Sequence, residues 1–201
     1  MQDDFAIWFA GKDFSTDWTS SRIPIFAESL SDRRERVRNV LEIGSWEGRS
    51  AVFFLNFFPD CKVTSIDTFA GSAETDNHSD WAALVPHCEQ RFDANLAEYG
   101  PRVEKIKSSS GAALPRLATA FRRFDFIYVD GSHHSADVYS DATLSWPMLE
   151  RGGVLAFDDY GWALMEAEAE CPKLGTDAFL AGHEGQYREL YRGYQIIIEK
   201  V

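Results

Sequence analysis

Residues 40–50, which read Val-Leu-Glu-Ile-Gly-Ser-Trp-Glu-Gly-Arg-Ser, constrain the fold of this chain more than any other stretch. The apolar, β-branched run at 39–43 predicts a buried strand. Gly44 and Gly48 then interrupt the pattern, and the apolar run that follows, stopped by Pro59, predicts a helix. This order is typical of the first unit of a nucleotide-binding α/β sheet, because glycines let the main chain approach a ligand and a helix N-terminus offers unpaired N–H groups.

The spacing of the two glycines bears on the kind of ligand. A dinucleotide-binding turn carries G-x-G-x-x-G, whereas this turn has only Gly44 and Gly48. The missing middle glycine argues against a pyrophosphate on this turn, and therefore against a Rossmann oxidoreductase.

Composition and charge limit the class of protein. With 201 residues and 45% apolar content, the chain suits one domain with a large core. A net charge of −12 disfavours a nucleic-acid or anionic-membrane surface, since either would need a basic face. The acidic N-terminus does not resemble a signal peptide, and three widely spaced cysteines suggest no disulfide framework. We therefore expect a reduced, cytoplasmic protein.

Alternating strand and helix patterns continue to the end of the chain. Six further strands are predicted at residues 62–67, 103–107, 124–130, 154–159, 188–191 and 194–201. Five strand–helix units and a closing hairpin predict a Rossmann-like α/β fold: a mostly parallel seven-stranded sheet with one antiparallel strand and helices on both faces. We expect residues 1–38 to form a helical cap and residues 39–201 the ligand-binding domain.

Polar residues gather where these strands end, which is where open α/β sheets bind ligands. Asp67 ends the second strand about twenty residues after the glycine turn and could accept hydrogen bonds from both hydroxyls of a ribose. Ser108 to Ser110 end the third strand, where an adenine edge would lie; alternatively, Ser110 caps the next helix. The two interpretations of the serines remain open.

Three carboxylates end the fourth and fifth strands. Asp130 ends one strand, and Asp158 and Asp159 end the other. Neighbouring strands lie about 4.8 Å apart, so these acids would repel one another unless a hard divalent cation such as Mg²⁺ bound between them. The alternative is that one aspartate caps a turn and the others are solvated.

His133 lies three residues beyond Asp130, on the same edge of the predicted sheet. An imidazole can act as a general base at neutral pH, so His133 could accept a proton from a cation-bound hydroxyl. An ordinary surface histidine is the alternative. No His/Cys quartet has the spacing of a zinc site.

Taken together, these motifs resemble class I S-adenosylmethionine (SAM) methyltransferases, and within them the small O-methyltransferases of the catechol and macrolide-sugar types. The resemblance rests on LEIGSWEGRS at 41–50, IDTF at 66–69, FIYVDGSH at 126–133 and RGGVLAFDDY at 151–160. Catechol-type members carry a lysine near the position of His133, so the histidine favours the macrolide-sugar type.

The resemblance implies a class I methyltransferase fold and assigns site residues. Gly44 and its neighbours would approach the methionine moiety of SAM, Ser50 its carboxylate, Asp67 the ribose and Ser109 the adenine. The implied cofactor-binding residues are Glu42, Gly44, Ser45, Trp46, Gly48, Ser50, Asp67, Thr68, Ser108, Ser109 and Asp130. Asp130, Asp158 and Asp159 would bind a divalent metal ion, and His133 and Asp130 would be catalytic.

The expected function is therefore metal-assisted O-methylation of a small molecule, with SAM and Mg²⁺ or a similar cation as cofactors and with no nucleic-acid or membrane partner. The alternatives are a metal-independent N-methyltransferase and a non-catalytic SAM-binding domain. We expect the loop at 70–82 and the N-terminal aromatic residues to shape the acceptor pocket. The sequence does not identify the methyl acceptor. It also leaves open whether the protein forms a homo-oligomer.

Overall fold

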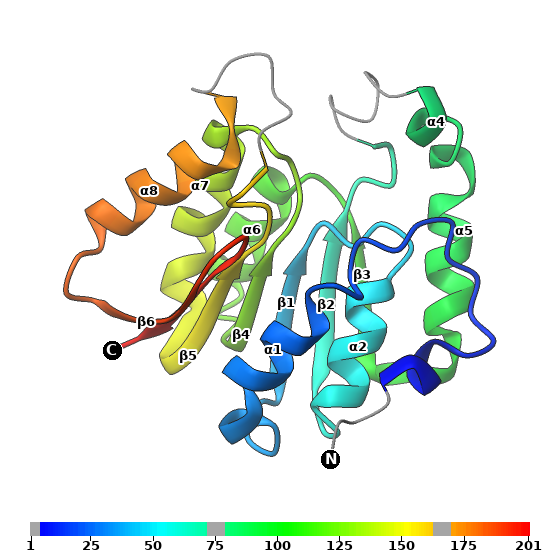
Figure 1. Ribbon diagram of the computed structural model, residues 1–201, viewed down its shortest axis with the longest axis horizontal. Helices are drawn as coiled ribbons and strands as arrows, with labels where there is room; N and C mark the ends of the chain where they lie inside the picture. Colours follow the sequence, from blue (N-terminus) through cyan, green and yellow to red (C-terminus); the bar gives the residue numbers. More distant parts are fainter. Residues whose placement is uncertain (1–4, 72–78, 163–169) are drawn as a thin grey trace.

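The computed structural model describes residues 5–71, 79–162 and 170–201, which form a seven-stranded sheet (Figure 1). The strands are β1 (Asn39–Ile43), β2 (Lys62–Asp67), β3 (Val103–Lys107), β4 (Phe124–Val129), β5 (Leu149–Phe157), β6 (Tyr187–Arg192) and β7 (Ile196–Lys200). Their order across the sheet is β3-β2-β1-β4-β5-β7-β6, and β7 pairs antiparallel with both of its neighbours. The predicted mostly parallel, Rossmann-like sheet with one reversed strand is confirmed.

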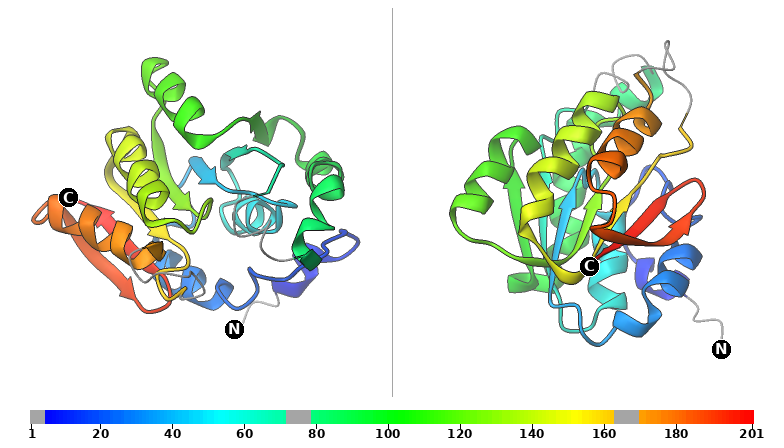
Figure 2. Two further views of the ribbon diagram at one scale, coloured as in Figure 1. Left: turned by 90° about the horizontal axis from the view of Figure 1, so that it is seen from above. Right: turned by 90° about the vertical axis from the view of Figure 1, so that its left-hand side faces the viewer.

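Helices pack on both faces of this sheet (Figure 2). The α-helices are α1 (Ile23–Ser29), α2 (Arg49–Phe57), α4 (Ser79–Ala82), α5 (Val85–Leu96), α6 (Ser110–Thr119), α7 (Ser135–Ser145) and α8 (Pro172–Gly182). Short 3₁₀ turns are η1 (Phe5–Phe9), η2 (Ser31–Arg33), η3 (Ala97–Arg102) and η4 (Trp146–Met148). Among the described residues, no helix has the length and apolar character needed to cross a bilayer.

Two hydrophobic cores lie on opposite faces of the sheet because strand side chains alternate in direction. In β1, Val40 belongs to the core covered by α1, α2 and α5, while Leu41 and Ile43 belong to the core covered by α6, α7 and α8. The parallel strands are buried on both faces, which explains their nearly continuous apolar sequence.

The N-terminal segment packs into the first of these cores. Ile23, Phe26 and Leu30 are at most 4% exposed, and the Phe26 ring lies 5.5 Å from that of Phe54 in α2, centroid to centroid. The segment thus shares a core with the sheet. The proposed division between residues 1–38 and 39–201 remains a prediction.

The fifth strand begins earlier than predicted. The sequence suggested a tight turn at residues 151–153 leading into a strand at Val154, but β5 already pairs with β4 at Leu149. The pairing register between β4 and β5 shifts between Phe124 and Phe126, because β5 has extra residues at this point. One of these residues, Gly152, has φ +77°. Of the predicted loop at 70–82, residues 72–78 lie outside the described residues and Ser79–Ala82 form α4.

At Gly44, just after β1, the backbone lies very close to the backbone that follows β4. The φ of Gly44 is +84°, and a Cβ atom at this position would lie 2.0 Å from the carbonyl oxygen of Asp130. The Asp130 N–H donates to the Ile43 carbonyl at 2.8 Å, so the ends of β1 and β4 are joined just below the turn. Glycine is required here by both space and backbone conformation.

We therefore predict that Gly44→Ala lowers the free energy of unfolding by at least about 3 kcal/mol, because a methyl group would clash with rigid backbone. Urea denaturation measures this. Gly182→Ala, where an added Cβ meets no atom within 4 Å, is the matched control and should change stability by less than about 1 kcal/mol. Equal stability of the two variants would contradict the close approach of β1 and β4.

Candidate active site

A cavity of about 720 Å³ opens at the carboxyl ends of β1, β2, β4 and β5. Most of the predicted cofactor-binding residues line it: Gly44, Ser45, Trp46, Ser50, Asp67, Thr68, Ser108, Ser109 and Asp130. The predicted metal-binding residues and His133 line the same cavity. The fold therefore brings both sets of residues to one space.

Glu42 and Gly48 do not line the cavity, in contrast to the prediction for them. Glu42 is fully buried and accepts hydrogen bonds from the hydroxyls of Ser45 (2.6 Å), Ser50 (2.5 Å) and Ser65 (2.8 Å). Burial raises the pKa of Glu42, and the three hydroxyls oppose that rise. Glu42 thus orients Ser45 and Ser50 from behind, since strand alternation turns its side chain into the core.

Gly48 faces α5, where an added Cβ would lie 2.9 Å from Leu96 and 3.1 Å from Phe92. Its φ of +81° completes the turn before α2 begins. The role of Gly48 is therefore to bring α2 and α5 together beside the turn, rather than to face the cavity.

Asp67 holds the glycine turn in place. One of its carboxylate oxygens accepts the backbone N–H groups of Ser45 (2.7 Å) and Trp46 (2.8 Å), and the other accepts that of Phe69 (2.7 Å). These bonds tie the end of β2 to the turn after β1. Trp46 is held at φ +48°, a conformation that needs such support. The proposed contact of Asp67 with a ribose stays a prediction.

The serines after β3 have separate environments. The helix α6 begins at Ser110, with Ser109 at the N-cap position but making no side-chain cap hydrogen bond. The Ser110 hydroxyl instead hydrogen-bonds to the Asp141 carboxyl group of α7. The capping alternative for Ser110 is thus wrong, while Ser108 and Ser109 remain on the cavity wall.

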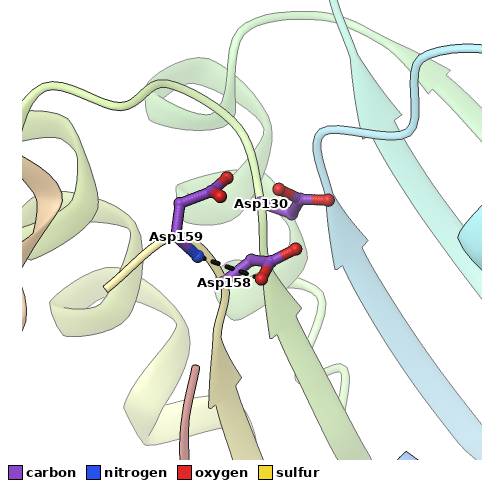
Figure 3. Close-up of side chains that lie close together, drawn as sticks. All are labelled: Asp130, Asp158 and Asp159. Atoms are coloured by element: carbon purple, nitrogen blue, oxygen red, sulfur yellow. Dashed lines mark hydrogen bonds between the residues drawn. The ribbon is translucent and has the colours of Figure 1, made fainter. Parts of the chain in front are cut away.

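The three predicted metal ligands converge. Asp130 follows β4 and Asp158 and Asp159 follow β5, and oxygen atoms of all three lie within 4.8 Å of one another (Figure 3). Asp159 has φ +52°, so the backbone leaves the extended conformation after Phe157. This bend lets two consecutive side chains point to the same place, which an extended strand would not allow.

The surrounding residues that the structure describes offset the negative charge of the three carboxylates to different extents. Burial and the repulsion of Asp158 and Asp159 raise the pKa of Asp130 well above its usual range. Burial and Asp159 also raise the pKa of Asp158, although the Tyr128 hydroxyl, at 2.5 Å, and Arg22 oppose this. Burial alone would raise the pKa of Asp159 too, but His133, Tyr194 and Arg22 lower it.

A hard divalent cation fits this set of donors. All three side chains offer oxygen atoms, the ligand type that Mg²⁺ and Ca²⁺ prefer. Burial and, after it, repulsion from Asp158 and Asp159 raise the pKa of Asp130, and such an ion would relieve that repulsion. The residues present are therefore compatible with the predicted metal site.

His133 is held between a carboxylate and an aromatic ring. Its Nε2 atom lies 2.7 Å from Oδ2 of Asp159, and its ring stacks on Trp162 with centroids 4.6 Å apart and planes at 22°. A carboxylate partner favours the proton on Nε2. Asp159 and Trp162 thus fix the orientation of the imidazole ring beside the carboxylates.

Several residues at the cavity were not anticipated. Arg22 lies 3.3 Å from Asp158, measured from Nε to Oδ1, and the Tyr194 hydroxyl donates to Asp159 at 2.8 Å. Both come from segments without a recognisable motif, so no local pattern marks them. The tryptophans form a chain of ring contacts along the cavity wall: Trp46, Trp18, Trp81 and Trp162. Of these, Trp46 was predicted to bind the cofactor, and Trp18 and Trp81 belong to the N-terminal aromatic residues and the 70–82 loop that were expected to shape the pocket. Trp162 was not predicted.

Glu47 fastens the N-terminal segment to the glycine turn. It is 1% exposed and accepts hydrogen bonds from the backbone N–H and hydroxyl of Ser15 at 2.5 and 2.6 Å. Arg91 of α5 pairs with it at 2.9 Å. Through Glu47, the glycine turn therefore holds the N-terminal segment that carries Trp18 and Arg22.

Asp141 is a buried carboxyl group on the cavity wall that the sequence did not mark. It is 4% exposed, and its Oδ2 lies 3.6 Å from where a Cβ of Gly131 would be. Burial raises its pKa from 3.8 to about 6, against the hydrogen bond from Ser110. Asp141 therefore supports the turn that follows Asp130 from the side of α7.

Comparison with known proteins agrees with this geometry. The family described as "Methyltransferase domain" matches residues 41–160. "Probable caffeoyl-CoA O-methyltransferase 3" of Dictyostelium discoideum is 26% identical over 151 residues, which cover 71% of this chain and 54% of that protein. The chain spans about half the length of the curated relatives it matches.

Solved structures share the fold. MycE methyltransferase from the mycinamycin biosynthetic pathway, in complex with Mg, S-adenosylhomocysteine (SAH) and mycinamycin VI, has a TM-score of 0.63 and 20% identity. The match covers 97% of this chain and 52% of that one. SAH-bound methyltransferase PaMTH1 of Podospora anserina has a TM-score of 0.60 and 17% identity, over 98% of this chain and 93% of that one.

We predict that Asp141→Asn changes how stability depends on pH. The folded-state pKa of Asp141 exceeds the unfolded value, so the wild type loses stability as the pH rises from about 4 to above 6. The variant has no carboxyl group to titrate at this position, so its free energy of unfolding should rise by about 2–3 kcal/mol relative to that of the wild type over this pH range. Urea denaturation at pH 4 and pH 7 measures the difference, and Glu35→Gln, at an exposed position away from the cavity, controls for the loss of one carboxylate. A gain in the opposite direction would contradict the assignment.

Proposed function

The chain belongs to the methyltransferase domain family, and from this premise we propose that it transfers a methyl group from SAM to a hydroxyl of a small molecule, assisted by a divalent cation. One observation carries the proposal: a single cavity of about 720 Å³ joins the glycine turn to three convergent carboxylates and a carboxylate-bound histidine. The turn suits a nucleoside-containing donor, and the carboxylates suit an ion beside the acceptor.

At one end of the cavity, the methyl donor SAM would bind to the glycine turn and to nearby serine residues. The hydroxyls of Ser45 and Ser50 are oriented by Glu42, and the backbone between them is held by Asp67. We infer that these groups bind the methionine end of SAM, and that Ser108 and Ser109 lie toward the adenine. Bound SAM supplies an electrophilic methyl group on a positively charged sulfur.

The acceptor end would use the histidine and the acids. Asp130, Asp158 and Asp159 would hold a divalent cation, which lowers the pKa of a coordinated hydroxyl. His133 would accept the hydroxyl proton, and Asp159, 2.7 Å from its Nε2 atom, would stabilise the resulting imidazolium. Methyl transfer would form the bond between the acceptor oxygen and the methyl carbon of SAM and would break the bond between that carbon and sulfur, leaving SAH.

The charge of the cavity supports an uncharged or cationic acceptor. Among the described residues that line it, Arg22 and Arg49 are the only arginines or lysines, and each pairs with an aspartate. Because both arginines are already paired, the described residues of the cavity wall offer no further arginine or lysine side chain to bind the phosphates of a coenzyme A ester. An acceptor resembling free phenols or sugars fits better than the thioester named in the curated relative.

An amine acceptor remains the second candidate, because acid-lined cavities with aromatic walls also bind cations. Such an N-methyltransferase would need no metal ion. A domain that binds SAM without transferring its methyl group is the third candidate. Cytoplasmic location and homo-oligomer formation remain predictions.

We predict that SAH binds the protein in a calorimetric titration and that methyl transfer to small-molecule hydroxyls stops in EDTA and returns with Mg²⁺. Radiolabelled SAM and a panel of phenol and sugar acceptors provide the assay. Transfer to amines that persists in EDTA would support the N-methyltransferase instead. SAH binding without transfer to any acceptor would support the non-catalytic domain, and failure to bind SAH would contradict all three.

We also predict that His133→Ala lowers kcat by about 10²–10⁴-fold, the usual contribution of a general base, while the Kd for SAH changes less than about threefold. His87→Ala, at an exposed position of α5, is the matched control and should retain activity. Steady-state kinetics and calorimetry on the same preparations measure both quantities. Comparable losses in turnover and SAH affinity would argue against a role as base.

A further inference from the structure

Arg22 approaches the carboxylate cluster from a distant part of the chain. It lies at the N-cap position of α1, and its side chain is 19% exposed. Its Nε atom donates to Oδ1 of Asp158 at 3.3 Å, and Nη2 lies 3.9 Å from Oδ1 of Asp159. A guanidinium group therefore occupies one side of the cluster in which the cation would bind.

The position of this guanidinium is fixed by its surroundings. Its Cζ atom lies 4.0 Å from the centroid of the Tyr194 ring, a cation–π contact. The Tyr194 hydroxyl donates in turn to Asp159, so ring, guanidinium and carboxylates hold one another. The buried neighbours Ile23 and Phe26 anchor the helix that follows Arg22.

The charge of Arg22 is permanent, unlike that of its neighbours. Tyr128 and Tyr194 donate hydrogen bonds to Asp158 and Asp159 from hydroxyl groups that carry no charge. Arg22 stays protonated at all physiological pH values. It thus supplies a fixed positive charge that partly balances the three carboxylates without a metal ion.

We propose that Arg22 is a resident counter-cation that positions Asp158 and Asp159 and sets a low affinity of the cluster for divalent cations. The inference rests on the proposed metal site. Two consequences follow from one charge: the guanidinium holds the carboxylates together before an ion arrives, and it repels the ion once it is there. At separations near 4 Å in a partly buried site, such repulsion changes affinity strongly.

Removing the charge should therefore strengthen metal binding while weakening the metal-free fold. A purely structural residue would show only the second effect. Arg22→Gln removes the charge, and Arg22→Met also keeps an apolar stem against Tyr194. Arg22→Lys retains the charge and should behave like the wild type. Arg123→Gln, which removes an exposed arginine that donates to the Arg122 carbonyl, is the charge-matched control.

The experiment titrates the full chain with Mn²⁺ and follows free Mn²⁺ by electron paramagnetic resonance. We expect Arg22→Gln and Arg22→Met to bind Mn²⁺ about tenfold or more tightly than the wild type. Arg22→Lys and Arg123→Gln should stay within about threefold of it. In EDTA the two neutral variants should melt at a lower temperature than the wild type, and Mg²⁺ should raise their Tm more than it raises that of the wild type. A neutral variant that folds only when Mn²⁺ is present would also support the proposal.

The outcomes separate this inference from the function on which it rests. If the wild type binds Mn²⁺ and neither neutral variant binds it more tightly, the role of Arg22 is overturned and the metal site stands. If wild type and variants all bind SAH but none binds Mn²⁺, metal assistance fails and the role of Arg22 fails with it.

Discussion

The close contact between the glycine turn and the end of β4 determines the rest of the site. Gly44 lies against the backbone of Asp130, and the Asp130 N–H is bonded to the Ile43 carbonyl. Because β1 and β4 are neighbours in the sheet although far apart in sequence, this contact joins the glycine turn to the carboxylates. A side chain at residue 44 would force these two halves apart, so the cavity depends on the absence of one methyl group.

Burying so many acids requires a partner for nearly every one of them. Glu42 accepts hydrogen bonds from three serine hydroxyls, and Glu47 accepts them from Ser15 and Arg91. Asp67 accepts hydrogen bonds from three backbone N–H groups. Each of these acids fixes a piece of backbone or a side chain that faces the cavity. The cluster of Asp130, Asp158 and Asp159 differs, because its repulsion is only partly offset, and this contrast separates structural acids from those available to a ligand.

Several site residues come from outside the stretch that the methyltransferase domain family matches. Arg22 and Trp18 belong to the N-terminal segment, and Tyr194 lies between β6 and β7. Arg22 and Tyr194 contact Asp158 and Asp159, and Trp18 contacts Trp46, all of which lie within the matched stretch. The flanking segments thus complete a cavity whose glycine turn, carboxylates and histidine come from the family-wide part of the chain.

The sequence by itself determined the sheet, its one reversed strand and the collection of Asp67, Asp130, Asp158, Asp159 and His133 at one edge. It could do so because strand periodicity and glycine turns are local signals, and parallel strands all end on the same side. It did not reveal that Glu42 and Gly48 face away from the cavity, or that Arg22 and Tyr194 reach the carboxylates. Those facts depend on how segments distant in sequence pack together, which only the tertiary structure decides, since a lone arginine or tyrosine in an irregular segment carries no local signal of its partner.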